Sequence, residues 1–566
     1  MQFDRRRGDF ATHFIAVVLM PCMWLLSAEP ALLLGADDLA ARFATRAEFD
    51  AFVQAGESSP FGLDYVFVHS PAARNRKLVE HFCREMGIRW VNLTRLDWKR
   101  VEPKPPSGGR HSYDWSDLDA AVREWQRNGV HIMVSLRFES PWATAPRSDE
   151  EFVYLKGPAR HLALAGADYL PKPEHMAHLR AYVRSLVERY NGDGVNDMPG
   201  LRFPVRHYQV GNEYYNELFW AGSAEEYGHL LREVAGAARA ACPDVKIILS
   251  GIGFRDVPGF YAAEMDPRTE RFVRSRLPKV GPAMRRFVER AEAFSRTAAG
   301  FSDHYDILDA RWPNYGIVAK NKALLEELGC PEKPVWSAEV YSGFPLSEPL
   351  VLPNWTLHAW PTPSRSGEYL RVLRRPAHRQ FDEINRWYRG LQAAHVVKLC
   401  MVALDAGSEK LMMGWAVDAQ HALSVSTLSH HGLYSMTFRH LWPAAYTYGL
   451  TVRKLDGVRR VERLPMPPYV YVYRCELGDG KEVLVAFCDD HVGQNHDEPT
   501  AEIQARIPLR AERALLTHVI TDIGATEPRT ERVDVRGGFL HLRLTEYPVF
   551  IEPLRGKSSE RPKGSG

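Results

Sequence analysis

Two short apolar runs of this chain each end in a glutamate, YQVGNE at residues 208–213 and PVWSAE at 334–339. Such runs are typical of buried parallel strands, and an α/β barrel builds its active site at the carboxyl ends of these strands. Glu213 and Glu339 together suit glycoside hydrolysis, in which one carboxylic acid protonates the leaving oxygen while one carboxylate attacks or stabilises the anomeric carbon. Their separation along the chain fits strands four and seven of an eightfold barrel.

Alternating strand-like and helix-like segments supply the elements that would position the two glutamates. Eight strands are expected near residues 63–68, 90–93, 131–136, 208–210, 246–249, 307–309, 335–337 and 410–413. Helices are expected between them, for example at 73–86, 116–128 and 223–241. The last of these helices begins with Ser223 and Glu226 in the spacing of a capping box. The pattern predicts an α/β fold, a (β/α)8 TIM barrel.

The pattern changes after about Leu455. Short alternating runs separated by turn residues predict an antiparallel β-sandwich, with strands near 469–475, 482–488, 501–507, 514–520 and 539–544. We therefore expect a barrel domain over 37–455, a sandwich domain over 456–555 and a disordered tail over 556–566. A proline-rich, irregular stretch from Pro345 to Arg375 directly follows the second glutamate and is expected to overhang the barrel mouth.

The N-terminus has the order of an export signal. Three arginines at residues 5–7 precede an apolar run from Phe14 to Ala28 that is short for a membrane span. We expect a signal peptide over residues 1–28 and a secreted or periplasmic protein. An uncleaved N-terminal anchor is the alternative.

The composition is that of a globular enzyme and argues against several other classes. In 566 residues, 45% hydrophobic and 11% aromatic content allow a large core and leave rings for a sugar-binding cleft. The net charge is +2 and no long basic run occurs, so a nucleic-acid partner is not indicated. Neither metal-ligand spacing of Cys and His nor a glycine-rich phosphate loop is present, so we expect no metal and no cofactor. We also expect no stable membrane partner.

Seven cysteines are too few for a disulfide framework in a chain of this size. Most of them are expected to be small buried apolar side chains. Cys475 and Cys488 lie on successive strand-like runs around a Gly-Asp-Gly turn, so a hairpin could bring them together. Two outcomes stay open for this pair, a disulfide or two free thiols.

The barrel region resembles the clan A retaining glycoside hydrolases, of the family thirty-nine and forty-two type that includes β-xylosidases and β-galactosidases. The resemblance covers residues 60–455 and extends beyond the two glutamates. The further motifs are GIRWV at 87–91, Trp98, VEP at 101–103, YDW at 113–115, Asp119, SPWA at 140–143, GLY at 432–434 and WPAAY at 442–446.

The resemblance implies roles for three residues. Glu213 would be the general acid/base and Glu339 the nucleophile, about 5 Å apart, with a covalent glycosyl-enzyme on the path. Burial and the charge of Glu339 would raise the pKa of Glu213 so that it can donate a proton. Asn212 would hydrogen-bond the sugar 2-hydroxyl.

The chain departs from the family pattern at two places that bear on substrate binding. Asn92 stands where relatives show arginine at the end of strand two, and Arg95 is the nearest residue to orient Glu339 instead. After strand six, relatives show histidine and an aromatic residue, whereas this chain has Arg311 and Trp312, with Tyr315 close behind. All five are candidate substrate-binding residues.

Arginines and aromatic residues at strand ends suggest what the site binds. Four arginines, Arg95, Arg137, Arg255 and Arg311, would favour an anionic glycan such as a uronide, unless they pair with neighbouring carboxylates. Rings that could stack on a sugar are Trp142, Trp312 and Trp415, followed by Tyr214, Tyr215, Trp220 and Tyr341. Trp90, Trp98, Trp115 and Trp125 are assigned to structural packing.

The sequence therefore predicts a retaining glycoside hydrolase that cleaves a β-glycosidic or α-L-arabinofuranosidic bond in an oligo- or polysaccharide. A catalytically inactive glycan-binding relative of the same fold is the alternative. A metal-dependent barrel hydrolase would need histidine and aspartate ligands at strand ends, and the sequence offers no such set.

Overall fold

The computed structural model describes residues 43, 45–144, 167–216, 219–252, 282–310, 317–341, 364–418, 430–489 and 494–554. The predicted signal peptide and tail lie outside these ranges, as does most of the proline-rich stretch after Glu339. The described part of that stretch contains helix α13 (Ser366–Leu373), so it is regular where irregular structure was expected. Within the described ranges, no helix is both long and apolar enough to span a bilayer.

Eight parallel strands close into a barrel in chain order, and β1 pairs with both β2 and β8. The strands are β1 (Phe61–Phe67), β2 (Trp90–Asp97), β3 (His131–Arg137), β4 (His207–Val210), β5 (Lys246–Ile252), β6 (Ile307–Ala310), β7 (Val335–Tyr341) and β8 (Leu411–Gly414). All eight predicted strands are confirmed. They could be predicted because each is a short apolar run buried on both faces.

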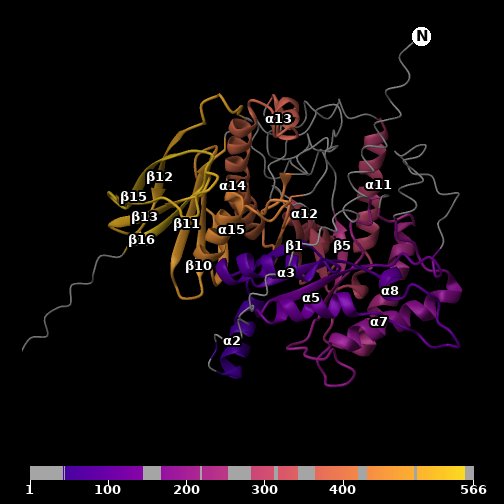
Figure 1. The fold of residues 1–566 in the computed structure, drawn as a ribbon. Coiled ribbons are helices and arrows are strands. Elements are labelled where there is room, and N and C mark those ends of the chain that lie inside the picture. Colours follow the sequence, from indigo (N-terminus) through magenta and orange to yellow (C-terminus); the bar gives the residue numbers. More distant parts are fainter. Residues whose placement is uncertain are drawn as a thin grey trace, which may run out of the picture.

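Helices surround the barrel (Figure 1). They are α2 (Arg46–Glu57), α3 (Ala72–Leu78), the π-helix η2 (Val79–Glu85), α4 (Trp98–Val101), α5 (Ser116–Gln126), η3 (Pro173–His175), α7 (Met176–Tyr190), α8 (Ala224–Ala241), α11 (Pro282–Ala299), η5 (Ser302–His304), α12 (Ile317–Glu327), α13, α14 (Phe381–Asp405) and α15 (Pro443–Lys454). The predicted capping box is confirmed at α8, where Ser223 Oγ accepts from the Glu226 N–H and Glu226 Oε2 accepts from the Ser223 N–H.

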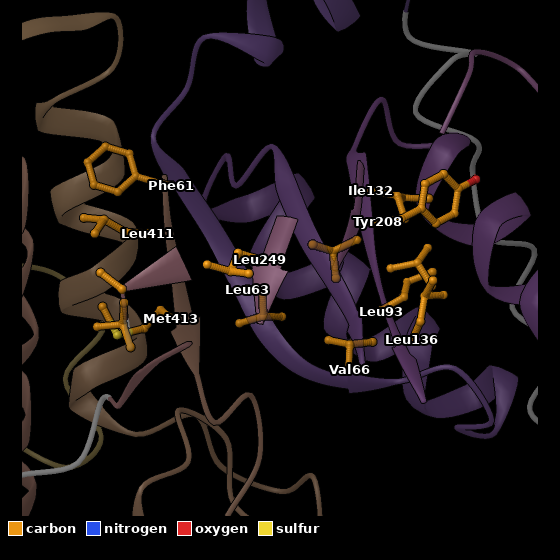
Figure 2. Packing of buried hydrophobic residues seen from close by; sticks show 14 of the residues in the cluster. Phe61, Leu63, Val66, Leu93, Ile132, Leu136, Tyr208, Leu249, Leu411 and Met413 are labelled. Carbon is orange, nitrogen blue, oxygen red and sulfur yellow. The ribbon is translucent and has the colours of Figure 1, made fainter. Parts of the chain in front are cut away.

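Strand side chains alternate between two environments, as a closed barrel requires. One set, which includes Leu63, Leu93 and Leu249, belongs to a large core cluster shared with the surrounding helices (Figure 2). The other set fills the barrel interior. At its base it forms a separate buried cluster of Trp90, Met133, Ile248, Ile307, Trp336, Ala338 and Met412.

The C-terminal part is a β-sandwich made of a six-stranded sheet, in the order β14-β13-β16-β11-β10-β9, and the pair β12-β15. Its strands are β9 (Val458–Arg463), β10 (Val470–Leu477), β11 (Glu482–Cys488), β12 (Ile503–Pro508), β13 (Arg513–His518), β14 (Thr530–Asp534), β15 (Phe539–Leu544) and β16 (Val549–Leu554). The five predicted strands are confirmed, and β9, β14 and β16 are additions that the sequence analysis lacks.

Helices α14 and α15 connect the barrel to this sheet (Figure 1). Thr447 on α15 exchanges two hydrogen bonds with the backbone of Ile520, of 2.9 and 3.0 Å. Lys398 on α14 lies 3.3 Å from Asp489 Oδ2, and both side chains are buried. The barrel and the sandwich therefore share an interface with specific polar contacts.

Of the two outcomes left open for Cys475 and Cys488, the structure has free thiols, and both cysteines are buried. In the β10–β11 hairpin Cys475 lies opposite Val483, whereas Cys488 lies opposite Val470. The two thiols thus occupy opposite ends of the ladder. They also face different core clusters, because side chains alternate between the two faces of a sheet.

Candidate active site

Glu339 lies in the carboxyl half of β7 and is buried, with 2% of its surface exposed. Tyr65 on β1 donates a hydrogen bond of 2.6 Å from its hydroxyl to Glu339 Oε1. The preceding residue is held as well, because the Ala338 N–H donates to Asp309 Oδ1 on β6 at 2.8 Å. Contacts from two other strands therefore fix the position of this carboxylate.

Glu213 lies in the turn after β4 and is 5% exposed. Its backbone has a φ of +48°, in the left-handed region that non-glycine residues seldom adopt. The turn opens with Gly211 at φ +85°, whose N–H donates to the Leu136 carbonyl at 3.1 Å. Asn212 lies in the same turn directly before Glu213 and is partly exposed. Both predicted catalytic glutamates thus lie at carboxyl ends of barrel strands, here called the mouth.

Irregular strand pairing changes the direction of further side chains at the mouth. The register between β1 and β2 shifts between Leu63 and Val66, and that between β2 and β3 shifts between Leu93 and Leu96. Tyr65 at φ +57° and Arg95 at φ +64° lie within these shifts. An extra residue in a strand re-aims the side chains around it, and unusual φ values concentrate at functional sites.

A chain of hydrogen bonds crosses the barrel interior between the apolar base and the mouth. Asn92 Nδ2 donates to Asp64 Oδ1 at 2.8 Å. The Ser135 hydroxyl lies 2.9 Å from Asn92 Oδ1 and 2.7 Å from Gln209 Oε1. Gln209 Nε2 in turn donates to Asp309 Oδ2 at 2.6 Å. Through Asp309 this polar chain reaches the backbone beside Glu339.

Asn92, a predicted substrate-binding residue, is a member of this polar chain and only 1% exposed. The predicted substitute, Arg95, has a side chain that is 27% exposed, with Nε 3.5 Å from Asp97 Oδ1. The hydrogen bond on Glu339 described above comes from Tyr65, which the sequence analysis does not single out. A role of Arg95 at Glu339 stays a prediction.

Of the four arginines considered for the mouth, Arg137 follows the alternative of pairing with a carboxylate. Arg137 is buried, and its Nε donates to Asp168 Oδ2 at 2.6 Å, so it serves an internal ion pair. Burial alone would lower the pKa of Arg137, but the carboxylate of Asp168 outweighs it and holds that pKa above its usual value. Arg255 and Arg311 lie outside the described residues.

The predicted aromatic residues divide into two groups. Trp415 after β8 is partly exposed, and its ring centroid lies 4.6 Å from that of Tyr65. Trp142 is also partly exposed, and its Nε1 donates to the Glu102 carbonyl at 3.0 Å. Three further rings of the sugar-stacking prediction, Tyr214, Tyr215 and Trp220, are buried and serve packing. Trp312, Tyr315 and the side chain of Tyr341 lie outside the described part.

The tryptophans assigned to packing, Trp90, Trp98, Trp115 and Trp125, are indeed buried. Three contributors to the site escaped the sequence analysis, namely Tyr65, Asp168 and Asp309. In the described ranges, no group of three or more His, Cys, Asp or Glu side chains is arranged to hold a metal ion.

Comparison with known proteins gives a likeness of fold. No protein-family model and no curated protein sequence matches this chain. The catalytic domain of GH30 xylanase C from Talaromyces cellulolyticus superposes with a TM-score of 0.50 at 12% identity, covering 87% of this chain and 96% of that one. A monomeric β-xylosidase from Caulobacter crescentus CB15 gives a TM-score of 0.49 at 13% identity over 88% and 97% of the two chains. At 12% identity the likeness to the xylanase domain is one of fold alone.

Proposed function

We propose that this protein is a retaining glycoside hydrolase, with Glu213 as general acid/base and Glu339 as nucleophile. The observation that carries the proposal is the placement of two buried glutamates at the carboxyl ends of β4 and β7, one of them hydrogen-bonded by Tyr65. The mouth is the part of a barrel where catalytic residues from different strands meet. The partly exposed ring of Trp415 lies against Tyr65, the residue bonded to Glu339, and would suit a sugar, as would the partly exposed ring of Trp142 after β3.

The reaction would proceed by two displacements at the anomeric carbon. First, a Glu339 carboxylate oxygen forms a bond to that carbon, the bond to the leaving oxygen breaks, and the Glu213 proton passes to the leaving oxygen. Next, water attacks the same carbon, Glu213 takes a proton from the water, and the bond to Glu339 breaks. Configuration is retained. We propose a β-glycosidic or α-L-arabinofuranosidic bond as the one cleaved.

The test is hydrolysis of a panel of aryl glycosides, uronides and arabinofuranosides included, followed by polysaccharides. We expect one sugar to be released, and Glu339→Gln to lower its kcat/KM by at least about a thousandfold, because the covalent step is lost. Glu332→Gln, at an exposed glutamate just before β7, is the matched control and should retain activity. The first product seen by proton NMR should have the anomeric configuration of the substrate.

Three results would count against the proposal. An inverted first product would exclude the double displacement. Activity that survives Glu339→Gln would exclude Glu339 as the nucleophile. Glycan binding without turnover on any substrate would favour the inactive glycan-binding relative.

A further inference from the structure

Asp168 collects hydrogen bonds from several groups at the mouth. This buried carboxylate accepts from Arg137 Nε, from the Tyr214 hydroxyl and from the backbone N–H groups of Phe138 and Glu139. Its own backbone pairs with residues 219–221, where the Asp168 N–H donates to the Phe219 carbonyl at 2.8 Å. Asp168 therefore joins the end of β3 to the segment that follows Glu213.

Tyr214, the residue directly after Glu213, is held at several points. Its hydroxyl binds Asp168, and its N–H donates to Ser250 Oγ on β5 at 3.1 Å. Its ring stacks on Trp220, with centroids 4.9 Å apart and planes at 19°. The ring also lies directly over Gly211, where a Cβ atom would stand only 2.2 Å from Tyr214 Cζ. Together these contacts hold the Tyr214 side chain and the turn in a single conformation.

This arrangement matters because Glu213 has an unfavourable backbone conformation. A left-handed φ at a glutamate persists only where the surroundings over-determine it. Gly211 is tied to Leu136 before Glu213, and Tyr214 is tied to Asp168 and Ser250 after it. The direction of the Glu213 side chain depends on this backbone, because φ and ψ set where a side chain leaves the chain.

We propose that Tyr214 is a positioning residue for the acid/base carboxyl, acting through its hydroxyl bond to Asp168 and its backbone bond to Ser250. The inference rests on the proposed function of Glu213. Loss of the Tyr214 hydroxyl should make the orientation of the Glu213 side chain less fixed while leaving Glu339 in place. Proton transfer to the leaving group should then suffer more than nucleophilic attack.

The experiment compares two substrates of the sugar found in the panel, one with a poor phenyl leaving group and one with 2,4-dinitrophenyl, which leaves without a proton. In Tyr214→Phe, kcat/KM should fall by about tenfold or more for the phenyl glycoside, a fraction of the usual contribution of general acid catalysis, about 10²–10⁴-fold. For the dinitrophenyl glycoside it should change by less than about twofold. In the pH profile of Tyr214→Phe for the phenyl glycoside, kcat/KM should be lower on the basic limb. This limb reports the protonated form of Glu213.

Tyr190→Phe is the matched control. The Tyr190 hydroxyl also donates to an aspartate, Asp119, that pairs with an arginine, Arg189, but it lies on α7 at the outside of the barrel. A purely structural hydroxyl of this kind should change both substrates alike. If Tyr214→Phe fails to fold, as judged by its thermal unfolding, Ser250→Ala removes the second contact of Tyr214 and is expected to give the same selective loss.

The outcomes separate this inference from the proposed function. If the unmodified protein hydrolyses none of the aryl glycosides and none of the polysaccharides, the proposed function fails and this inference fails with it. If it hydrolyses the phenyl and dinitrophenyl glycosides, and Tyr214→Phe lowers the two kcat/KM values by the same factor or leaves both unchanged, the positioning role is overturned while the function stands.

Discussion

At the scale of single residues, Tyr65 is the most direct addition to the site. Its hydroxyl is 2.6 Å from Glu339 Oε1, and its ring lies against Trp415. A hydrogen bond to a charged acceptor is worth more than one between neutral groups, and here the acceptor is the proposed nucleophile. Tyr65 therefore holds the carboxylate in one orientation and links it to a candidate sugar-binding ring.

Tyr65→Phe should lower kcat/KM for every leaving group, because Glu339 attacks the anomeric carbon in the first step whichever group leaves. The hydrogen bond to a charged group contributes about 1.5–3 kcal/mol, so a loss of about 10–100-fold is expected. Steady-state kinetics on the released sugar measure it. Tyr448→Phe is the control, since its buried hydroxyl donates to the Gly62 carbonyl on the same strand at 2.8 Å. An unchanged kcat/KM in Tyr65→Phe would contradict the role.

Sequence reasoning could place the two glutamates at strand ends but could not place Tyr65 beside one of them, for a physical reason. The run around it, FGLDYVF, reads as an ordinary strand, and regular alternation would fix where its side chain points. The register shift and the positive φ of Tyr65 alter that direction. Such irregularities arise from how β1 fits its neighbours in the closed barrel, which one strand's sequence does not contain.

At the scale of elements, the polar chain connects strands that are distant in sequence. It contains two aspartates, Asp64 and Asp309, at its ends and the single hydroxyl of Ser135 between two amide oxygens. One hydroxyl proton serves only one of those oxygens at a time. The direction of the donors along the chain is therefore set by the carboxylate at each end.

Asp309→Ala should destabilise the fold by about 2–4 kcal/mol, because it leaves the Gln209 amide and the Ala338 N–H without their buried acceptor. Asp309→Asn should cost less, since Gln209 can rotate its amide, accept from the new Asn and donate to Ser135. Urea denaturation of the two variants measures this difference. Equal destabilisation by both would contradict a chain whose direction can reverse.

Lys410, at the base of the barrel, supplies a pH-dependent contribution. Its Nζ donates to the Glu57 carbonyl at 2.8 Å, and burial lowers the pKa of Lys410 from 10.5 to about 8. Between these two values the unfolded chain holds a proton that the folded protein has lost, so the free energy of unfolding rises with pH across this window. The gain is at most about 3 kcal/mol, at about 1.4 kcal/mol per pKa unit.

Lys410→Met should remove this rise. Denaturation of both proteins at pH 7.5 and pH 10 gives the difference in slope, which cancels the titration of other groups. Lys172→Met, at an exposed lysine, should keep the rise of the unmodified protein. A Lys410→Met protein with the same pH dependence as the unmodified one would show that this lysine does not titrate in the window.

Two of the three missed strands, β9 and β14, differ from the predicted strands in how they are buried. The barrel strands are apolar runs buried on both faces, so composition alone indicates them. Strands β9 and β14, with sequences VRRVER and TERVD, are the two edges of the six-stranded sheet and carry charged side chains into solvent. Charged residues protect an edge strand from pairing with other chains. They also replace the apolar residues from whose pattern a strand is predicted.

At the scale of the whole molecule, the barrel and the sandwich share one core cluster. Tyr471, Tyr473 and Phe487 of the sandwich belong to the same buried cluster as Val397 and Met401 of α14. The ion pair of Lys398 and Asp489 crosses the same interface. Neither part keeps its apolar surface covered when the other unfolds, so the two should unfold together.

The sequence allows each part to be followed separately. All tryptophans lie before residue 456, so tryptophan fluorescence reports the barrel side alone, whereas thiol labelling of Cys475 and Cys488 reports the sandwich. Both probes should give the same denaturation midpoint.

Lys398→Met leaves Asp489 buried without this cation, at a cost of about 3–5 kcal/mol, and should move both midpoints together. Replacing Asp489 by Leu in the same protein should restore most of the loss. Labelling of the cysteines at a denaturant concentration where fluorescence is still native would instead show two independent units joined by a weak contact.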